Sequence, residues 1–177
     1  MPRERRRIPT AIVEDIFSPN GHLRIDLMDE SAAAAIRESV RLARETRWDS
    51  LRSPHIFMGL LALPDPSIRN WGERLGADLR ELLCNFQELF HQTTAEAEPF
   101  LALSREFFSD NAIRLLRDSY QRAVDHQRDK FTSMDLLITL LTTPNSVIAE
   151  CFERNGVTAA KLTELAVIAE QYLPPAE

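Results

Sequence analysis

SPHIFMGLL, at residues 53–61, is matched 80 positions later by a second stretch of similar design, SMDLLITLL, at residues 133–141. The same shift aligns residues 28–76 with residues 108–156 without a gap, and 13 of these 49 pairs are identical. A match of this length is typical of a duplicated supersecondary unit. The sequence therefore predicts two copies of one unit, each built around one of these apolar stretches.

Each copy is predicted to open with an amphipathic helix. Small and apolar residues recur at spacings of three and four residues over 32–43 and again over 112–123. Asp29 and Ser109 stand where the N-cap of such a helix is expected, because their side chains accept hydrogen bonds from the first turn.

The second helix of each copy is predicted to begin at Ser53-Pro54 and at Ser133-Met134, with serine as the cap. Proline is tolerated in a first helical turn, since its missing N–H has no partner there. These helices are short and strongly apolar, so we expect them to be the most buried segments and to meet at the centre.

A third helix is predicted to end at Gly76 and Gly156, because a glycine readily adopts the positive φ that follows a helix. A fourth follows, beginning near Asp78 and Thr158. The fold class is thus predicted to be all-α, with eight helices in two repeats and no strand. The expected segments are an N-terminal arm (1–27), repeat 1 (28–90), a linker (91–107) and repeat 2 (108–173).

Composition excludes several classes of function. The chain has 177 residues and a formal net charge of -6, which argues against a general affinity for nucleic acid. No apolar run approaches the length of a membrane span, and no apolar segment follows the basic start, so we expect neither membrane insertion nor secretion and a cytoplasmic location. Cys84 and Cys151 cannot form a disulfide framework, and we expect both to be buried free thiols.

An enzyme is not expected. A Walker loop needs a glycine followed by lysine, and neither Lys130 nor Lys161 follows a glycine. The histidines and cysteines show no metal-ligand spacing, and no Gly-x-Ser-x-Gly sequence is present. We expect no cofactor and no metal.

The repeat resembles the Clp N-terminal repeat. In that family the stretch corresponding to residues 52–61 reads roughly Gly-Thr-Glu-His-Leu-Leu-Leu-Gly-Leu-Leu, and a later Leu-Gly-Val-Asp is similar to residues 75–78 and 155–158. The resemblance covers residues 28 to about 172. It implies a compact, pseudo-twofold all-α domain that normally precedes a Clp AAA+ unfoldase and receives adaptors or substrate segments. This chain would be a stand-alone protein of that kind or a domain cut from a longer one.

The resemblance also implies positions for a binding site. Some members bind phosphorylated arginine through a threonine at the first-helix cap and the glutamate before the histidine, once per repeat. The matching positions are Asp29 and Pro54 in repeat 1, and Ser109 and Met134 in repeat 2. Neither glutamate is present, and a carboxylate is the natural partner of a guanidinium group, so the sequence argues against this ligand.

Three further residues join the candidate partner-binding set. The family's histidine is kept as His55, which can equally be an imidazole packed at a helix end, and it becomes Asp135 in repeat 2. Trp48 follows the first helix, where it can anchor a partner or be partly buried. The apolar residues Phe100 to Leu103 can line a peptide groove or close the core.

Two functions remain open. The leading hypothesis is a non-enzymatic module that binds a protein or peptide segment and connects it to a Clp ATPase, peptidase or adaptor, through a groove between the repeats. The alternative is a regulatory sensor or scaffold that kept the fold and binds a small ligand or an unrelated partner. We expect a monomer or a weak homodimer, the latter formed through the arm.

Overall fold

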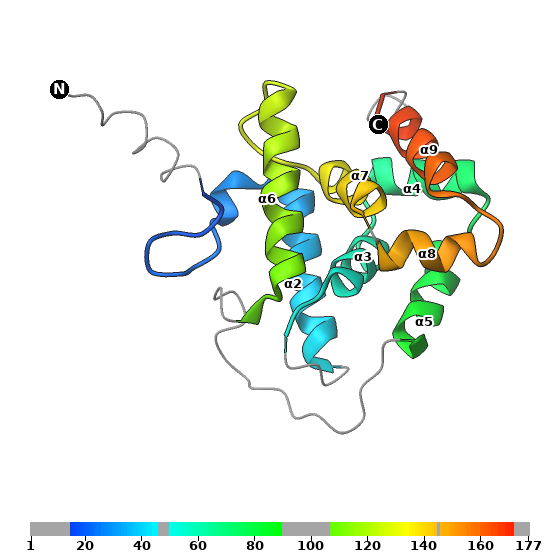
Figure 1. Cartoon of the computed structure of the whole chain (residues 1–177), viewed down its shortest axis with the longest axis horizontal. Coiled ribbons are helices and arrows are strands. Elements are labelled where there is room, and N and C mark those ends of the chain that lie inside the picture. The colour runs from blue at the N-terminus through cyan, green and yellow to red at the C-terminus, as the bar shows by residue number, and fades with distance from the viewer. Residues whose placement is uncertain (1–14, 46–49, 90–106, 145, 172–177) are drawn as a thin grey trace.

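The computed structural model describes residues 15–45, 50–89, 107–144 and 146–171. Within these ranges a short 3-10 helix, η1 (Ile25–Leu27), precedes eight α-helices, and the β-structure there is limited to isolated bridges. The first four helices are α2 (Glu30–Glu45), α3 (Ser53–Ala62), α4 (Pro66–Leu75) and α5 (Leu79–Leu89). The second four are α6 (Asp110–Asp125), α7 (Ser133–Thr142), α8 (Val147–Glu153) and α9 (Ala159–Gln171). The predicted all-α fold is confirmed (Figure 1).

Several of the predicted helix ends are found in the structure. Gly76 and Gly156 follow α4 and α8 with φ values of 77° and 87°, in the left-handed region that favours glycine. At the start of α5, Asp78 accepts a hydrogen bond from the backbone N–H of Arg80 (3.0 Å). These signals are local, which is why the sequence alone could place them.

The predicted caps of α3 and α7 were wrong by one residue. Ser53 and Ser133 are already helical, and the N-cap residues are Arg52 and Thr132. The Ser133 hydroxyl instead donates to the carboxylate of Asp65, the N-cap of α4 in the other repeat (2.5 Å). A serine that looked like a local cap therefore forms a contact between the repeats.

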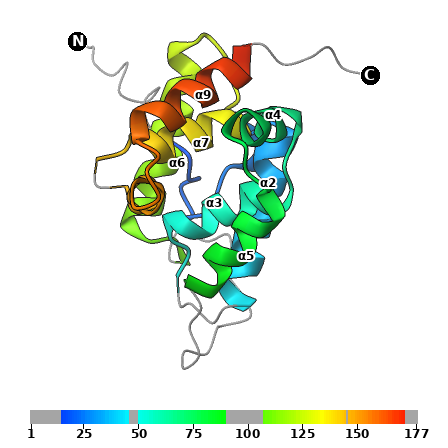
Figure 2. The ribbon, with the colours of Figure 1, turned by 90° about the vertical axis from the view of Figure 1, so that its right-hand side faces the viewer.

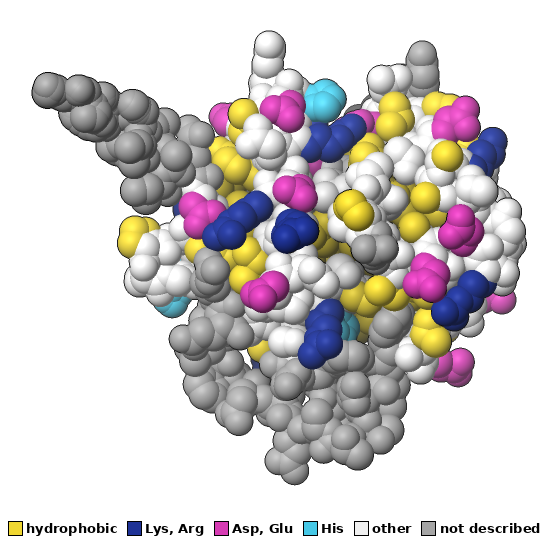
Figure 3. Space-filling model, in the orientation of Figure 1, with side chains coloured by type: hydrophobic (Ala, Val, Ile, Leu, Met, Phe, Trp, Pro, Cys, Tyr) yellow, Lys and Arg dark blue, Asp and Glu magenta, His cyan; other side chains and the backbone are white. Residues whose placement is uncertain are grey.

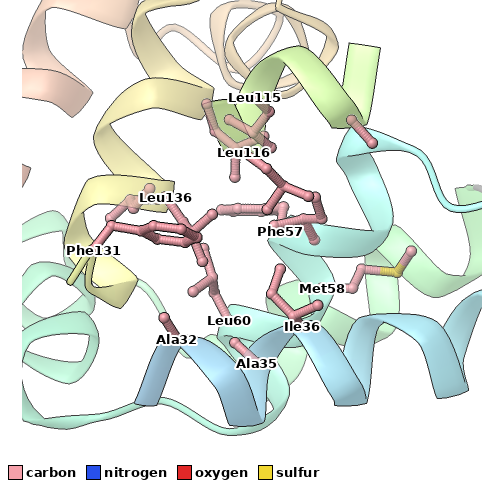
Figure 4. Close-up of a cluster of buried hydrophobic side chains, with 14 of the residues drawn as sticks. Ala32, Ala35, Ile36, Phe57, Met58, Leu60, Leu115, Leu116, Phe131 and Leu136 are labelled. Atoms are coloured by element: carbon pink, nitrogen blue, oxygen red, sulfur yellow. The ribbon is translucent and has the colours of Figure 1, made fainter. Parts of the chain in front are cut away.

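The two apolar helices, α3 and α7, lie at the centre of the molecule and pack against each other, as predicted. Figure 4 shows Phe57 and Leu60 of α3 beside Leu136 of α7 and Leu116 of α6. Each of these four side chains is almost fully excluded from solvent. Burial of large apolar side chains of this kind contributes roughly 1.5–3 kcal/mol each, so this central packing stabilises the fold substantially.

Within repeat 1, α2 and α3 approach closely at Gly59. A Cβ atom added there would overlap the Ser39 hydroxyl and the Ala35 carbonyl oxygen of α2. The Ser39 hydroxyl is buried at this contact, and it donates a hydrogen bond to the Ala35 carbonyl oxygen of its own helix (2.6 Å). Glycine is therefore required by the packing of two helices, not by an unusual backbone conformation.

The two repeats are joined by reciprocal backbone pairings. Met28, before α2, forms a parallel bridge with Phe131, before α7, while Phe108, before α6, forms the same bridge with Leu51, before α3. Adding 80 to 28 and to 51 gives 108 and 131, so the two bridges are equivalent. These two pairings, which we call the seam, express the pseudo-twofold symmetry directly.

A second contact between the repeats joins α4 to α9, which lie side by side in both views (Figures 1 and 2). Trp71 of α4 is fully buried, and its indole N–H donates to the carbonyl oxygen of Leu162 at 3.2 Å. The Asn70 side-chain amide donates to the carbonyl oxygen of Ala169 at 3.3 Å. Both are helix carbonyls of α9, so the contact is closed by polar as well as apolar groups.

The described part of the predicted arm packs against repeat 2. Ile16 and Phe17 are buried, and the Phe17 ring meets that of Phe108 edge to face, with centroids 5.8 Å apart. Asp15 forms an ion pair with Arg117 of α6 (3.0 Å). Residues 15–27 are thus part of the folded domain, while the basic residues of the extreme N-terminus lie outside the described residues.

The thiols differ from expectation. Cys84 is exposed and Cys151 is half-buried, so the prediction of two buried thiols was wrong. Cys84 lies on the solvent-exposed face of α5. The prediction relied on the usual burial of free cysteines and did not consider which face of the helix the residue occupies. No helix among the described residues is both long and apolar enough to cross a lipid bilayer.

Candidate functional site

One end of the seam carries Asp29. Its carboxylate caps α2 by accepting from the backbone N–H of Ala32 (2.8 Å), and its own N–H donates to the carbonyl oxygen of Phe131 (3.0 Å). Partial burial raises the pKa of this carboxyl, and the neighbouring carboxylates of Asp65 and Asp135 raise it further. A half-buried acidic group therefore lies where the two repeats meet.

The other end of the seam carries Ser109. Its hydroxyl caps α6 by accepting from the backbone N–H of Ala112 (3.1 Å), and its N–H donates to the carbonyl oxygen of Leu51 (2.9 Å). The backbone arrangement is the same as at Asp29, but the side chain carries no charge. The two ends are thus equivalent in shape and different in electrostatics.

The structure groups the predicted residues across the repeats and not within them. Asp29 precedes α2 of repeat 1 but is paired with the residues that lead into α7, where Met134 and Asp135 lie. Ser109 is likewise paired with the residues that lead into α3, where Pro54 and His55 lie. Each candidate site is therefore built from both repeats.

Asp135 is the centre of an internal ion-pair network. Its side chain is fully buried and accepts from Arg122 of α6 (2.5 Å) and from Arg128 (2.6 Å). Arg122 also pairs with Glu170 of α9 (3.0 Å). Burial alone would raise the pKa of Asp135, but hydrogen bonds from Arg128, the Thr132 backbone and Arg122 hold the pKa below its ordinary value.

His55 occupies the matching position in repeat 1 and is also internal. Its side chain is 1% exposed, and its Nδ1 accepts from the backbone N–H of Arg52 at 3.0 Å. Burial lowers the pKa of the imidazole from 6.5 to about 4, assisted by the charge of Arg52. His55 is therefore neutral near pH 7 and joins the start of α3 to the preceding loop.

Accessibility separates the predicted site residues into three groups. Asp29 and Ser109 are half-buried and reach the surface. Trp48 lies outside the described residues. The others are buried and present almost no surface to a partner in this conformation: Pro54, His55, Met134 and Asp135.

A wide cleft that the sequence did not indicate lies between the end of α7, α8 and α9. Its volume is about 930 Å³, and its walls include Thr142, Ser146, Glu153 and Glu164. These residues come from three helices, and no local motif links them. Among the described residues, no group of three or more His, Cys, Asp or Glu is placed to hold a metal ion.

Comparison with known proteins identifies the fold. No protein-family model and no curated protein matches the sequence. Solved structures do match: the N-terminal domain of ClpD from Arabidopsis thaliana has a TM-score of 0.63 at 17% identity, covering 86% of this chain and 99% of that one. The N-domain of ClpV from Vibrio cholerae has a TM-score of 0.61 at 14% identity, covering 96% and 93%.

A third match is a complex of a ClpV N-domain with a VipB peptide, at a TM-score of 0.59 and 15% identity, covering 96% of each chain. Each of the three matches covers most of this chain and nearly all of the matched chain. The chain has the fold of the Clp N-terminal domains.

Proposed function

We propose that this chain is a non-enzymatic, cytoplasmic module that binds adaptor or substrate segments and delivers them to a Clp-type AAA+ unfoldase or protease. The observation that carries the proposal is the match to a ClpV N-domain in complex with a VipB peptide, which spans 96% of this chain. The shared fold supports a peptide-binding role for this chain.

The surface at the two ends of the seam is the candidate contact area. Asp29 and Ser109 reach solvent there, and the exposed side chains of Glu30 and Asp110 follow them in the first turns of α2 and α6. Both helix starts therefore present acidic groups beside the junction of the repeats. A partner segment with basic or hydrogen-bond-donating groups is the chemical match.

One observation favours the alternative, a sensor or scaffold with the same fold that serves no Clp machine. The carboxylate of Asp135, which stands at the family's histidine position, is bound by the chain's own Arg122 and Arg128. A group that is already paired internally is not available to recognise an arginine of a partner. Asp135 therefore does not replace the glutamate that is missing at Met134, and the family's arginine-binding pattern is not restored in repeat 2.

The test is a pull-down with the tagged chain from a soluble lysate of its host, with and without ATP, analysed by mass spectrometry. Recovery of a Clp ATPase or peptidase supports the leading proposal. Its absence, with an unrelated protein or a stabilising small molecule enriched instead, supports the alternative. Deleting the module should alter substrate choice of a partner unfoldase and leave its basal ATP hydrolysis intact.

Two exchange variants test the position of the contact. Asp29→Ser gives repeat 1 the capping residue of repeat 2, and Ser109→Asp gives repeat 2 the capping residue of repeat 1. Serine and aspartate cap helices about equally well. We expect recovery of the partner to change while the melting temperature of the chain stays nearly constant. If both variants recover as much partner as the parent chain, the partner binds at another surface and not at the seam.

A further inference from the structure

The pseudo-twofold symmetry predicts two equivalent contacts between the third helix of one repeat and the fourth helix of the other. A shift of 80 positions carries α4 onto α8 and the start of α5 onto the start of α9. The α4–α9 contact should therefore have a counterpart between α8 and α5. The first contact is closed by Trp71, which is fully buried and hydrogen-bonded to α9.

Among the described residues, the second contact is not closed by a large side chain at the position equivalent to Trp71. A groove of about 270 Å³ lies between α5 and α8, and we call it the α5–α8 groove. Cys151, which is half-buried and lines this groove, is the repeat-2 counterpart of Trp71, since 71 plus 80 is 151. The position that carries an indole at the first contact carries a thiol at the second.

The inner surface of the groove is apolar and aromatic. Phe86 and Phe152 line it and are both almost fully buried, with ring centroids 6.4 Å apart. Leu82 and Leu89 also line it, and Leu89 is 58% exposed, unusually open for a large apolar side chain. In Figure 3 hydrophobic side chains reach the surface in the region where Figure 1 places α5 and α8, with charged side chains around them.

The rim of the groove carries a positive charge. Arg154 lines it, on a chain whose net charge is -6. Arg154 pairs with Glu150 at 3.6 Å, and the two side chains are 72% and 64% exposed. An exposed pair of this kind contributes little stability, so the guanidinium can exchange its partner for a carboxylate of a ligand.

We propose that the α5–α8 groove binds an aromatic side chain of a partner peptide that has a carboxylate on the next residue. The aromatic ring takes the place that Trp71 occupies at the symmetric contact and packs against Phe86 and Phe152, for which an edge-to-face arrangement is favourable. The carboxylate pairs with Arg154. This inference rests on the proposed peptide-binding function and names the chemistry of one segment that the module accepts.

The test uses the full chain and short synthetic peptides as probes. The peptide acetyl-Gly-Trp-Asp-Gly-amide is titrated into isotope-labelled chain, and NMR shifts are followed at the methyl groups of Leu82 and Leu89. Acetyl-Gly-Ala-Asp-Gly-amide and acetyl-Gly-Trp-Lys-Gly-amide are the controls. We expect the Trp-Asp peptide to shift these methyl groups, the alanine peptide to leave them unchanged, and the lysine peptide to bind more weakly.

Three variants connect binding to the groove. Cys151→Trp should fill it from within and weaken binding by about tenfold or more, with a melting temperature equal to or above that of the parent chain. Leu89→Ser, at an exposed position, should weaken peptide binding without affecting folding. It keeps the proposal testable if the tryptophan of Cys151→Trp does not fit into the groove. Arg154→Gln should weaken the Trp-Asp peptide about threefold and leave the Trp-Lys peptide unaffected.

Leu63→Ser is the matched control, because Leu63 is also a half-exposed leucine but follows α3 and does not line the groove. Binding that persists in Cys151→Trp and Leu89→Ser, or shifts confined to other helices, would overturn the proposal. Concentration-dependent dimerisation that shifts the same methyl groups without peptide would show a second copy as the occupant and would overturn it too. The pull-down of a Clp ATPase by the parent chain is a separate measurement. If the α5–α8 groove does not bind the peptide, the proposed function is therefore not contradicted.

Discussion

Met28 and Phe131 lie side by side as a parallel β-bridge, in which Phe131 donates to the carbonyl oxygen of Leu27 (2.9 Å) and its carbonyl accepts from Asp29 (3.0 Å). The two residues are 103 positions apart and belong to different repeats. The equivalent bridge between Leu51 and Phe108 connects the repeats in the opposite sense. Each repeat therefore supplies hydrogen-bonding partners that the other lacks.

We expect, as a consequence, that neither repeat folds alone. A fragment of residues 1–90 would leave the seam without its partners and would expose Phe57, which packs against Phe152 of repeat 2 (6.1 Å between ring centroids). Far-UV circular dichroism should show little cooperative unfolding for this fragment or for residues 91–177. Mixing the two fragments should restore a single transition. A well-dispersed NMR spectrum from either fragment by itself would contradict this.

Substitution of Gly59 should be costly although the residue is helical. Glycine to alanine normally stabilises a helix by about 1 kcal/mol, but the Cβ at Gly59 meets the Ala35 carbonyl oxygen, a backbone atom that cannot move cheaply. We expect Gly59→Ala to lower the free energy of unfolding by about 1–3 kcal/mol, as overpacked sites do. Urea denaturation followed by circular dichroism measures this.

Gly72→Ala is the matched control for that experiment. Its Cβ would meet the end of the Leu79 side chain at 2.8 Å, a group that can rotate away. The cost should therefore be small or absent. Equal losses from both variants would show that the α2–α3 contact is not specially tight.

The fold was largely predictable because the repeat supplied each signal twice. A capping residue or a glycine that recurs after 80 positions, as Gly76 and Gly156 do, is stronger evidence than either occurrence alone. The seam could not be predicted in the same way, since its pairs are distant in sequence and consist of backbone contacts that leave no side-chain pattern.

The candidate site was less predictable for a related reason. The helix that starts at Ser53 is apolar on nearly every side, so its pattern gives no outward face. Pro54 and His55 were selected by position and proved to be buried. The α5–α8 groove depends on a difference between the repeats, Trp71 against Cys151, and the sequence showed that difference but not the space that it leaves.

The buried carboxylate of Asp135 should be essential for stability. Asp135→Asn removes the negative charge that Arg122 and Arg128 both contact, leaving two partly buried guanidinium groups with Glu170 as their remaining partner. Loss of one member of a buried ion pair costs about 3–5 kcal/mol. Thermal and urea unfolding should show a loss of this size, whereas Asp118→Asn, at an exposed position of α6, should change stability by less than about 0.5 kcal/mol.

His55 should make the stability of the domain depend on pH. Its pKa falls from 6.5 to about 4 in the folded state, so the unfolded chain takes up a proton between these values while the folded chain does not. Stability therefore rises with pH through this window and is lost as the pH falls from about 6.5 toward 4, by at most about 3 kcal/mol.

The variant His55→Gln isolates this contribution. Glutamine at the third helical position can still accept from the backbone N–H of Arg52, as in a capping box, but it does not titrate. The difference in free energy of unfolding between parent and variant should shrink as the pH falls from 7 to 4, because only the parent loses stability through the histidine. A pH-independent difference for His55→Gln would mean that the buried imidazole keeps its ordinary pKa.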